Sequence, residues 1–238
     1  MSYTHVFAVC ACGESPYLEA CLRSLKAQTR PSEIMICTST PSAFLTKMGE
    51  KYGVPVYVRQ GQSNIRDDWN FAWEKADGDF VTLAHQDDLY HREYGEQLAK
   101  AVLSYPDLTV FTSDYVIVKG ERLISWDKLL LVRRLLRLPL RARALSHLSQ
   151  VKKLSLMFGN SICCPATTYC KKKIGEPLIH SDYSFVLDWD NMFRLANEPG
   201  RWICEERPLL YYRVHDGAAT KACIRSHKRE LEEREMFE

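Results

Sequence analysis

Short apolar runs alternate with amphipathic segments through the first half of the chain. Four runs have the length of a buried strand, and the segments between them repeat their apolar residues every three or four positions. The predicted strands are 5–10, 34–37, 54–58 and 80–84, and the predicted helices between them are 15–28, 41–52 and 67–76. Buried strands that alternate with helices are typical of a mainly parallel sheet with helices on its faces. We therefore predict an α/β, Rossmann-like fold.

The second half of the chain continues with both kinds of element. In order, they are a helix over 91–104, a strand over 109–112, its hairpin partner over 115–118 turning at Lys119-Gly120, a strand over 162–169, a helix over 185–197, a strand over 208–212 and a charged helix from Cys223 to the end. No internal repeat or low-complexity linker divides the sequence. We expect a single domain over 1–238.

Leucine and arginine dominate the segment from Leu129 to Lys153, which Pro139 divides into two helices. Helical spacing separates two faces, with Arg133, Arg137 and Arg141 on one and Leu131, Leu135 and Leu138 on the other. Between Lys119 and Lys153 there are ten basic and two acidic residues, which is +8 in a chain whose total is +2. Two interpretations stay open. Either the arginines contact anionic lipid headgroups while the leucines pack down, or the segment covers the sheet with a solvated basic face.

Composition narrows the class of protein. With 238 residues, 46% of them hydrophobic and 26% charged, the chain is an ordinary globular protein that needs no disulfides or structural metal for its core. The net charge of +2 does not indicate a nucleic-acid partner. Nine cysteines, several inside apolar patterns, indicate reduced, buried thiols. We recognise no signal peptide and no membrane-spanning run, and therefore expect a cytoplasmic protein.

An acidic cluster follows the fourth predicted strand, which runs directly into His85-Gln86-Asp87-Asp88. Ligands of open α/β sheets bind at the carboxyl ends of the strands. Two carboxylates at that edge form a site for a hard cation such as Mg²⁺ or Mn²⁺. The alternative is a solvated turn, in which aspartates are common.

Four segments, in order along the chain, resemble family 2 glycosyltransferases. Phe7 to Leu18, with 22–29 behind it, is similar to the opening strand and helix of that family, and 68–90 resembles its acidic nucleotide- and metal-binding region. Residues 187–196 resemble the catalytic-base helix, and 206–215 resembles the strand that ends in a metal-associated histidine. The resemblance implies a GT-A fold with a nucleotide-sugar half (1–118), a basic helical segment (119–158) and an acceptor half with the catalytic base (159–238).

The resemblance also implies roles for individual residues. Asp88 would ligate a Mn²⁺ or Mg²⁺ cofactor, Asp87 would reach the donor ribose or the same ion, and His215 would complete the metal or phosphate site. Asp188 would be the general base. Asp190 does not share a helical face with Asp188. It either stabilises the start of the helix through the helix dipole or orients residues that contact the substrate. The residues expected to bind the donor are Ala11, Cys12, Glu14, Thr38, Ser39, Arg66 and Asp87.

Several positions keep more than one interpretation. Thr38 and Ser39 stand where many relatives have an acidic residue, and His85 replaces the leading aspartate of the acidic motif. Arg66, expected in the loop before a helix, either reaches the diphosphate or is a solvated charge. Trp69 and Trp189 either stack on a sugar ring or pack in the core.

The resulting hypothesis is a metal-dependent, inverting glycosyltransferase. It would move a sugar from a nucleotide-diphosphate donor to a hydroxyl of a glycan or lipid-linked acceptor, in the cytoplasm or at the inner face of the cell membrane. One alternative is a catalytically silent binding module with the same fold. The other is a sugar nucleotidyltransferase, although Gly13-Glu14-Ser15 is poor in the glycine and basic residues of a phosphate loop.

Overall fold

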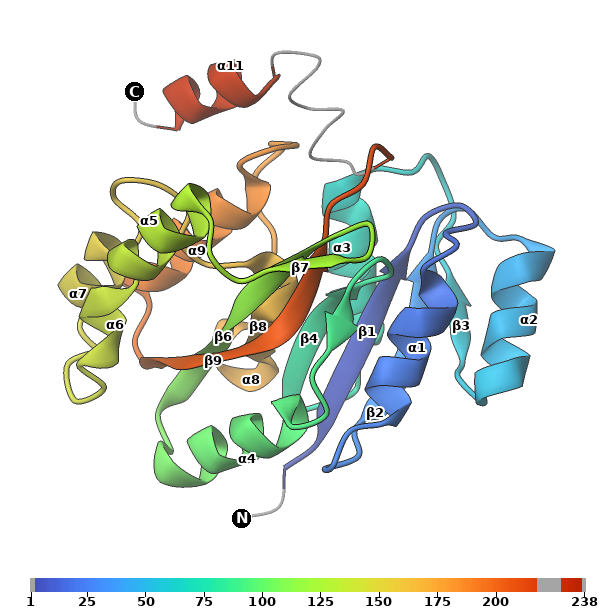
Figure 1. Cartoon of the computed structure of the whole chain (residues 1–238), viewed down its shortest axis with the longest axis horizontal. Helices are drawn as coiled ribbons and strands as arrows, with labels where there is room; N and C mark the ends of the chain where they lie inside the picture. Colours follow the sequence, from blue (N-terminus) through green and yellow to red (C-terminus); the bar gives the residue numbers. More distant parts are fainter. Residues whose placement is uncertain (1–2, 218–227, 237–238) are drawn as a thin grey trace.

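The computed structural model describes residues 3–217 and 228–236. Within these residues nine strands form one sheet in the order β3-β2-β1-β4-β8-β6-β9-β5, with β7 paired to β6 (Figure 1). The strands are β1 (His5–Ala11), β2 (Glu33–Thr38), β3 (Val56–Val58), β4 (Phe80–His85), β5 (Leu89–Tyr90), β6 (Leu108–Lys119), β7 (Arg122–Ile124), β8 (Thr167–Cys170) and β9 (Arg201–Arg213).

Helices cover both faces of this sheet. They are α1 (Leu18–Lys26), α2 (Ala43–Tyr52), α3 (Ile65–Lys75), α4 (Tyr94–Ser104), α5 (Lys128–Leu136), α6 (Leu138–Arg141), α7 (Ser149–Leu154), α8 (Lys171–Ile174), α9 (Leu187–Asn197) and α11 (Lys228–Glu235), with the 3-10 turn η1 at Cys164–Ala166. None of the helices in the described part of the chain is long and apolar enough to cross a membrane.

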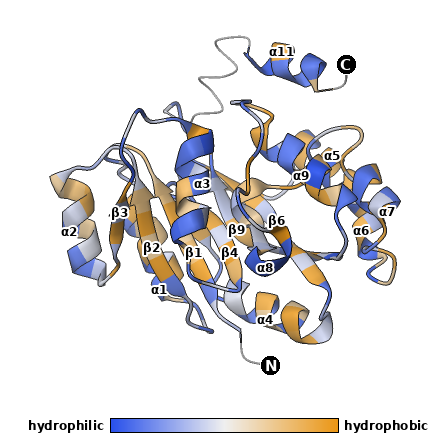
Figure 2. Cartoon of the chain, turned by 180° about the vertical axis from the view of Figure 1, so that it is seen from behind, coloured by the Kyte–Doolittle hydropathy of each residue, from blue (hydrophilic) through white to orange (hydrophobic). Residues whose placement is uncertain are grey.

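Two hydrophobic cores lie on opposite faces of the sheet, and β1 supplies both. Phe7 and Val9 pack with buried residues of α1, α2 and α4, whereas Val6 and Ala8 pack with residues of α3 and α9. The alternation follows from the pleat of a strand, which points successive side chains to opposite faces. Figure 2 shows the hydrophobic strands between the more polar helix surfaces. The predicted α/β fold is confirmed.

The parallel half of the sheet brings three strand ends together. Strand β1 pairs in parallel with β2 and with β4, so that Ala11 lies beside Thr38 and Cys10 lies beside His85. Because parallel strands end at the same edge, the loops after β1, β2 and β4 surround one region. The acidic turn at Asp87 is part of this edge.

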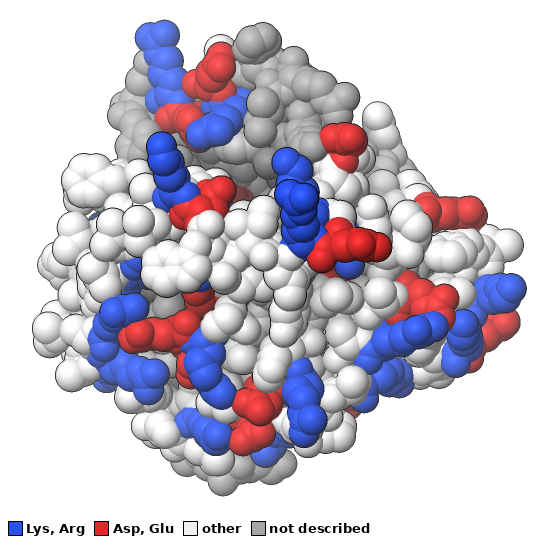
Figure 3. All heavy atoms as spheres, in the orientation of Figure 1, with Lys and Arg blue, Asp and Glu red and all other residues white. Residues whose placement is uncertain are grey.

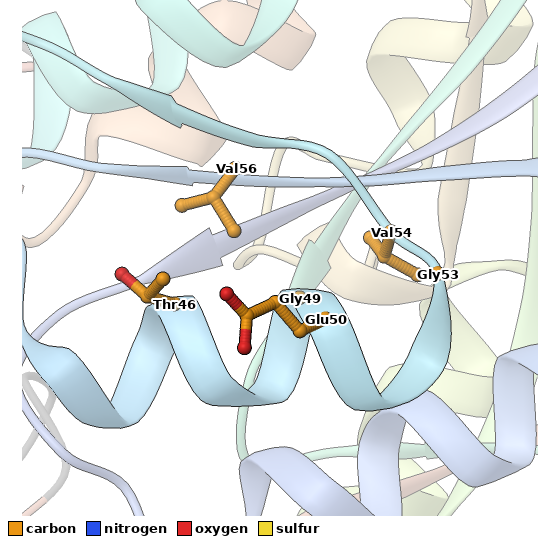
Figure 4. A pocket seen from close by; sticks show the side chains of 6 residues that line it. All are labelled: Thr46, Gly49, Glu50, Gly53, Val54 and Val56. Carbon is orange, nitrogen blue, oxygen red and sulfur yellow. The ribbon is translucent and has the colours of Figure 1, made fainter.

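The edge strand β3 packs closely on α2. A Cβ atom at Gly49 would lie 2.6 Å from a methyl carbon of Val56, so only glycine fits there. Gly53 ends α2 in the left-handed conformation, at φ +57°, as its position in the sequence predicted. The shallow hollow between α2 and the start of β3 is lined by Thr46, Gly49, Glu50, Gly53, Val54 and Val56 (Figure 4). It lies toward the amino end of β3, away from the acidic turn.

The predicted hairpin over 109–118 is wrong. Residues Leu108–Lys119 form one strand, β6, whose pairing with β9 shifts register near Ser113 and Asp114. The turn at Lys119-Gly120 leads instead to β7. Asp114 breaks the apolar pattern that would have identified a single strand, and the structure places this carboxylate in the interior, 5% exposed.

The Leu/Arg-rich segment folds with its arginines turned inward. Arg137 pairs with the buried Asp114, and Arg134 donates to the same carboxylate at 2.8 Å. Arg133 donates to the hydroxyl of Tyr115. The predicted solvated basic face, and with it a lipid contact through Arg133, Arg137 and Arg141, is therefore not formed. Only Arg141 lies at the surface, half-exposed and paired with Glu206.

The eight cysteines in the described residues are free thiols, and six of them are buried. Cys223 lies outside those residues. So does the first part of the predicted C-terminal helix, which is described from Lys228.

Candidate active site

The acidic turn between β4 and β5 holds two carboxylates in different environments. Asp88 is 1% exposed; its Oδ1 accepts from the backbone N–H of Arg213 at 2.8 Å, and its Oδ2 is buried without a hydrogen-bond partner. Burial raises the pKa of Asp88 to about 8, against the opposing effect of the Arg213 N–H. An enclosed oxygen without a donor is costly unless a proton or cation compensates it.

Asp87 remains partly accessible and contacts two residues that are far apart in the sequence. Its Oδ1 accepts from the Ser15 hydroxyl at 2.6 Å, and its Oδ2 lies 3.0 Å from Nε2 of His215. The antiparallel pairing of β5 with β9 brings His215 here across 128 positions of sequence. The structure thus joins His215 directly to Asp87, one of the two carboxylates that the resemblance associates with the same metal site.

Arg213 is a residue of this site to which the sequence assigned no role. Its Nε donates to the backbone oxygen of Asp87 at 2.9 Å, and its guanidinium carbon lies 4.4 Å from the ring centre of Tyr17. The ring of Tyr17 in turn lies 5.1 Å from that of His215. A cation held this close to the carboxylates favours anionic groups at the same edge. The sequence contained a signal, because Arg213 lies two positions before His215 in the segment 206–215, and side chains two positions apart in a strand point to the same face.

The predicted donor-binding residues gather around the ends of β1 and β2. Gly13 has φ +63° and donates its N–H to the Thr40 hydroxyl at 2.7 Å, which fixes the loop that carries Cys12 and Glu14. Gln86 holds the same loop through the backbone oxygen of Cys12, at 2.8 Å. Ala11 and Thr38 are buried, whereas Cys12 and Glu14 are exposed.

Two further side chains of this region have been placed by the structure. Ser39 has a buried hydroxyl without a hydrogen-bond partner. Arg66 lies in the first turn of α3 rather than in the loop before it, and it pairs with Asp67 and Asp182. Two carboxylates therefore engage its guanidinium, and the structure does not bring it to Asp87.

His85 and Trp69 belong to the interior of the site. Burial lowers the pKa of His85 to about 4, although Asp87 opposes this, so the imidazole is neutral at physiological pH. Its ring lies 5.3 Å from that of Trp69. Trp69 and Trp189 are each 7% exposed, and the Trp189 indole donates to the backbone oxygen of Leu156 at 3.1 Å. Both tryptophans pack in the core.

The predicted general base lies in the first turn of α9. Asp188 is partly exposed, and desolvation raises its pKa to about 6 while the charge of Arg133 lowers it. The Asn160 side chain also hydrogen-bonds to this carboxylate. Burial raises the pKa of Cys163 to about 12, and both Asp88 and Asp188 act on that thiol electrostatically. Asp88 and Asp188 are therefore both close enough to Cys163 to affect its ionisation.

The start of α9 is held by the C-terminal helix. The carboxylate of Glu232 on α11 accepts from the backbone N–H groups of Ser184, Phe185 and Val186, at 2.6 to 3.2 Å. A negative charge at this end of a helix is stabilised by the exposed N–H groups and the helix dipole. Sequence reasoning missed this contact, since a charged C-terminal helix gives no indication of its partner.

A comparison with known protein families shows which family the chain belongs to. Residues 7–174 match the model of glycosyl transferase family 2. The chain belongs to glycosyltransferase family 2. The match includes the acidic turn and the segment from α5 to α7, and it ends before α9. The assignment of Asp188 as the general base therefore does not rest on this match. No curated protein matches the sequence.

Solved structures show that this family 2 member has the GT-A fold. S. aureus TarS in complex with UDP-GlcNAc is 16% identical, with a TM-score of 0.67, over 92% of this chain and 61% of that one. The mannosyltransferase PcManGT from Pyrobaculum calidifontis, in complex with GDP-Man and Mn²⁺, is 15% identical, with a TM-score of 0.63, over 95% and 61%. The chain thus spans about three fifths of the length of these proteins.

A third similar structure comes from Mycobacterium tuberculosis. Glucosyl-3-phosphoglycerate synthase, in complex with Mn²⁺, UDP and glucosyl-3-phosphoglycerate, is 12% identical, with a TM-score of 0.62, over 93% of this chain and 77% of that one. At such identities the likeness concerns the fold alone.

Proposed function

We propose that the protein is an inverting glycosyltransferase that moves a sugar from a nucleotide-diphosphate donor to an acceptor hydroxyl. The observation that carries the proposal is that a family 2 member has both an Asp87–His215 pair at the strand ends and an aspartate, Asp188, suited to act as a base. Asp87 and His215 stand at the carboxyl ends of the strands, and Asp188, in the first turn of α9, has a pKa of about 6. A carboxylate with that pKa is suited to proton transfer near neutral pH.

A divalent cation fits the acidic turn. The accessible carboxylate of Asp87 and the imidazole of His215 offer an oxygen and a nitrogen at the same place, and this donor set suits Mn²⁺. Of the two aspartates, Asp87 is the accessible one and already lies 3.0 Å from His215, so we assign Asp87 and His215 as ligands. Asp88 would hold the end of β9 opposite them through the Arg213 N–H. When bound, the cation would neutralise charge that develops on the departing diphosphate.

The side chains of the chain perform the remaining steps. Asp188 takes the proton of the acceptor hydroxyl while the hydroxyl oxygen attacks the anomeric carbon from the face opposite the diphosphate. This attack displaces the diphosphate and inverts the configuration. Arg213, bound to the turn at the Asp87 oxygen, orients the anionic leaving group. Three of the similar structures contain UDP-GlcNAc, GDP-Man or UDP, which supports a nucleotide-sugar donor. We propose a glycan or lipid-linked acceptor.

Replacing the accessible carboxylate tests the cation assignment. Asp87→Asn should lower kcat/KM for sugar transfer by roughly a hundredfold or more, as loss of one group that stabilises transition-state charge does. The stimulation of nucleotide-sugar binding by Mn²⁺ should also disappear, as measured by calorimetry with and without EDTA. Asp182→Asn is the matched control, because Asp182 is 88% exposed and pairs only with Arg66 among the contacts described. If Mn²⁺ still stimulated nucleotide-sugar binding in Asp87→Asn, the ion would have to bind at other residues.

The rate of transfer should depend on pH through Asp188. Only the ionised carboxylate accepts a proton, so kcat should fall as pH drops below about 6. Arg133 lowers this pKa, and the neighbouring Cys163, Cys164 and Tyr169 are uncharged because burial raises their pKa values. Arg133→Gln should therefore move the acid limb of the pH profile to higher pH. Arg141→Gln, on the same segment but paired with Glu206, should leave the limb in place. A limb unmoved by Arg133→Gln would exclude this electrostatic role.

A further inference from the structure

Helix α5 presents its apolar side to solvent. Leu130, Arg133, Arg134 and Arg137 recur at the spacing of one helical face, and this face is turned inward, with Leu130 fully buried and Arg137 4% exposed. The opposite face carries Leu129, Leu131, Val132 and Leu135, each between 45% and 54% exposed. This is the reverse of an ordinary surface helix, which buries its apolar stripe.

Two aromatic side chains extend this apolar face. Trp126 is 77% exposed and Phe158 is 73% exposed, the two highest values among the large hydrophobic residues of the described chain. Trp126 precedes α5, and the guanidinium of Arg134 lies 5.6 Å from its ring centre. Phe158 adjoins Gly159, where a Cβ atom would meet a methyl carbon of Leu136 at 3.7 Å. Uncharged atoms predominate where α5 lies, at the left of Figure 3. Exposed apolar side chains gathered on one helix and the residues beside it mark an interaction site.

The charges of the segment that carries the patch favour an anionic partner. From position 122 to 159 the sequence contains a single carboxylate, Asp127, and that side chain caps α5 by accepting from the N–H of Leu129. The exposed cations of the segment include Lys128 and Arg143. Apolar and aromatic side chains with basic neighbours are the composition of a surface that enters the interface of an anionic bilayer. A second copy of the chain would bring the same positive charge against itself.

We propose that the outward face of α5, with Trp126 and Phe158, docks on an anionic lipid bilayer. The contact is apolar at its centre. The inward arginines take no part in it, because Arg137 pairs with Asp114 and Arg133 donates to Tyr115. Arg133, on the other side of the same helix, acts on Asp188. A docked bilayer would therefore lie about one helix diameter, roughly 10 Å, from the site. The consequence that a lipid-linked acceptor is taken from this bilayer rests on the proposed function; the docking itself does not.

Flotation of the 238-residue chain with vesicles tests the docking without donor or acceptor. The wild type should float with vesicles of phosphatidylglycerol and phosphatidylcholine and bind pure phosphatidylcholine at least tenfold more weakly. The double variant Trp126→Ser/Phe158→Ser should lose roughly tenfold or more of its partition coefficient, because two aromatic side chains no longer enter the interface. Both side chains are mostly exposed, so the core is untouched. Leu103→Ser/Leu231→Ser is the matched control, with both leucines 61% exposed on α4 and α11, and it should float like the wild type.

Three results would overturn the proposal. They are the absence of wild-type flotation with either vesicle, equal flotation of the aromatic double variant, and equal loss in the leucine control. Analytical ultracentrifugation separates the competing partner: a dimer that the aromatic double variant dissociates, without vesicle binding, would assign the face to self-association. Since no sugar transfer is measured, failure here leaves the proposed reaction to be judged by its own experiments.

Discussion

Asp188→Asn should abolish sugar transfer while the nucleotide-sugar donor still binds. Asparagine has nearly the same shape but cannot take the acceptor proton, and the loss of a general base costs on the order of 10² to 10⁴ in rate. In the proposed reaction the strand ends and the acidic turn hold the donor and Asp188 does not, so the affinity for the donor should change little. Calorimetry with the nucleotide sugar and a transfer assay measure the two effects separately.

Asp190→Asn provides the matched control for this experiment. Asp190 lies two positions further along α9, on another side of the helix. The Asp190→Asn variant should therefore retain most of the transfer activity. If Asp188→Asn lost donor affinity together with rate, Asp188 would be a donor contact rather than the base. A wild-type chain that bound nucleotide sugars but transferred and hydrolysed none of them would instead be a silent binding module.

Asp114→Ala should lower the free energy of unfolding by about 3–5 kcal/mol, because removing one member of a buried ion pair leaves the other charge uncompensated. The side chains of Asp114 and Arg137 are 7% and 5% exposed, and Arg134 binds the same carboxylate. Urea denaturation followed by circular dichroism measures the change.

Asp107→Ala is the control for the buried pair. Asp107 pairs with Arg201 near the surface, where its side chain is 46% exposed, and such pairs contribute about 0–1 kcal/mol. Similar losses in the two variants would show that the Asp114 cluster contributes no more than a surface ion pair. A large loss confined to Asp114→Ala would identify this cluster as the anchor of α5 on β6.

The first half of the fold could be predicted because its information is local. Strands β1, β2 and β4 are continuous apolar runs, and the helices between them repeat their apolar residues at helical spacing, so each element buries a face that its own sequence defines. Gly53 ends α2 for an equally local reason, its left-handed conformation. In this half of the chain the observed helix bounds differ from the predicted ones by a few residues at most, as at the start of α1. In the Leu/Arg-rich segment the two predicted helices are instead three, and Pro139 lies in the first turn of α6.

The Leu/Arg-rich segment shows where local information fails. Its sequence separates Arg133 and Arg137 from Leu131 and Leu135 correctly, but the choice of which face is buried depends on residue 114, more than ten positions upstream in β6. A buried carboxylate requires cations within hydrogen-bond distance, and this requirement outweighs the gain from burying the leucines. The orientation of α5 is thus a property of the tertiary structure.

The candidate site divides in the same way. The sequence by itself determined which chemistry is present: the carboxylates after β4, the aspartate at the start of α9 and the histidine after β9. Only the tertiary structure decided how they combine. The pairing of β5 with β9 sets His215 against Asp87, and burial separates the environments of Asp87 and Asp88. Helix α5 places Arg133 where its charge lowers the pKa of Asp188. Spacing along a chain specifies side chains and local conformation, whereas distances across more than a hundred residues are set by packing.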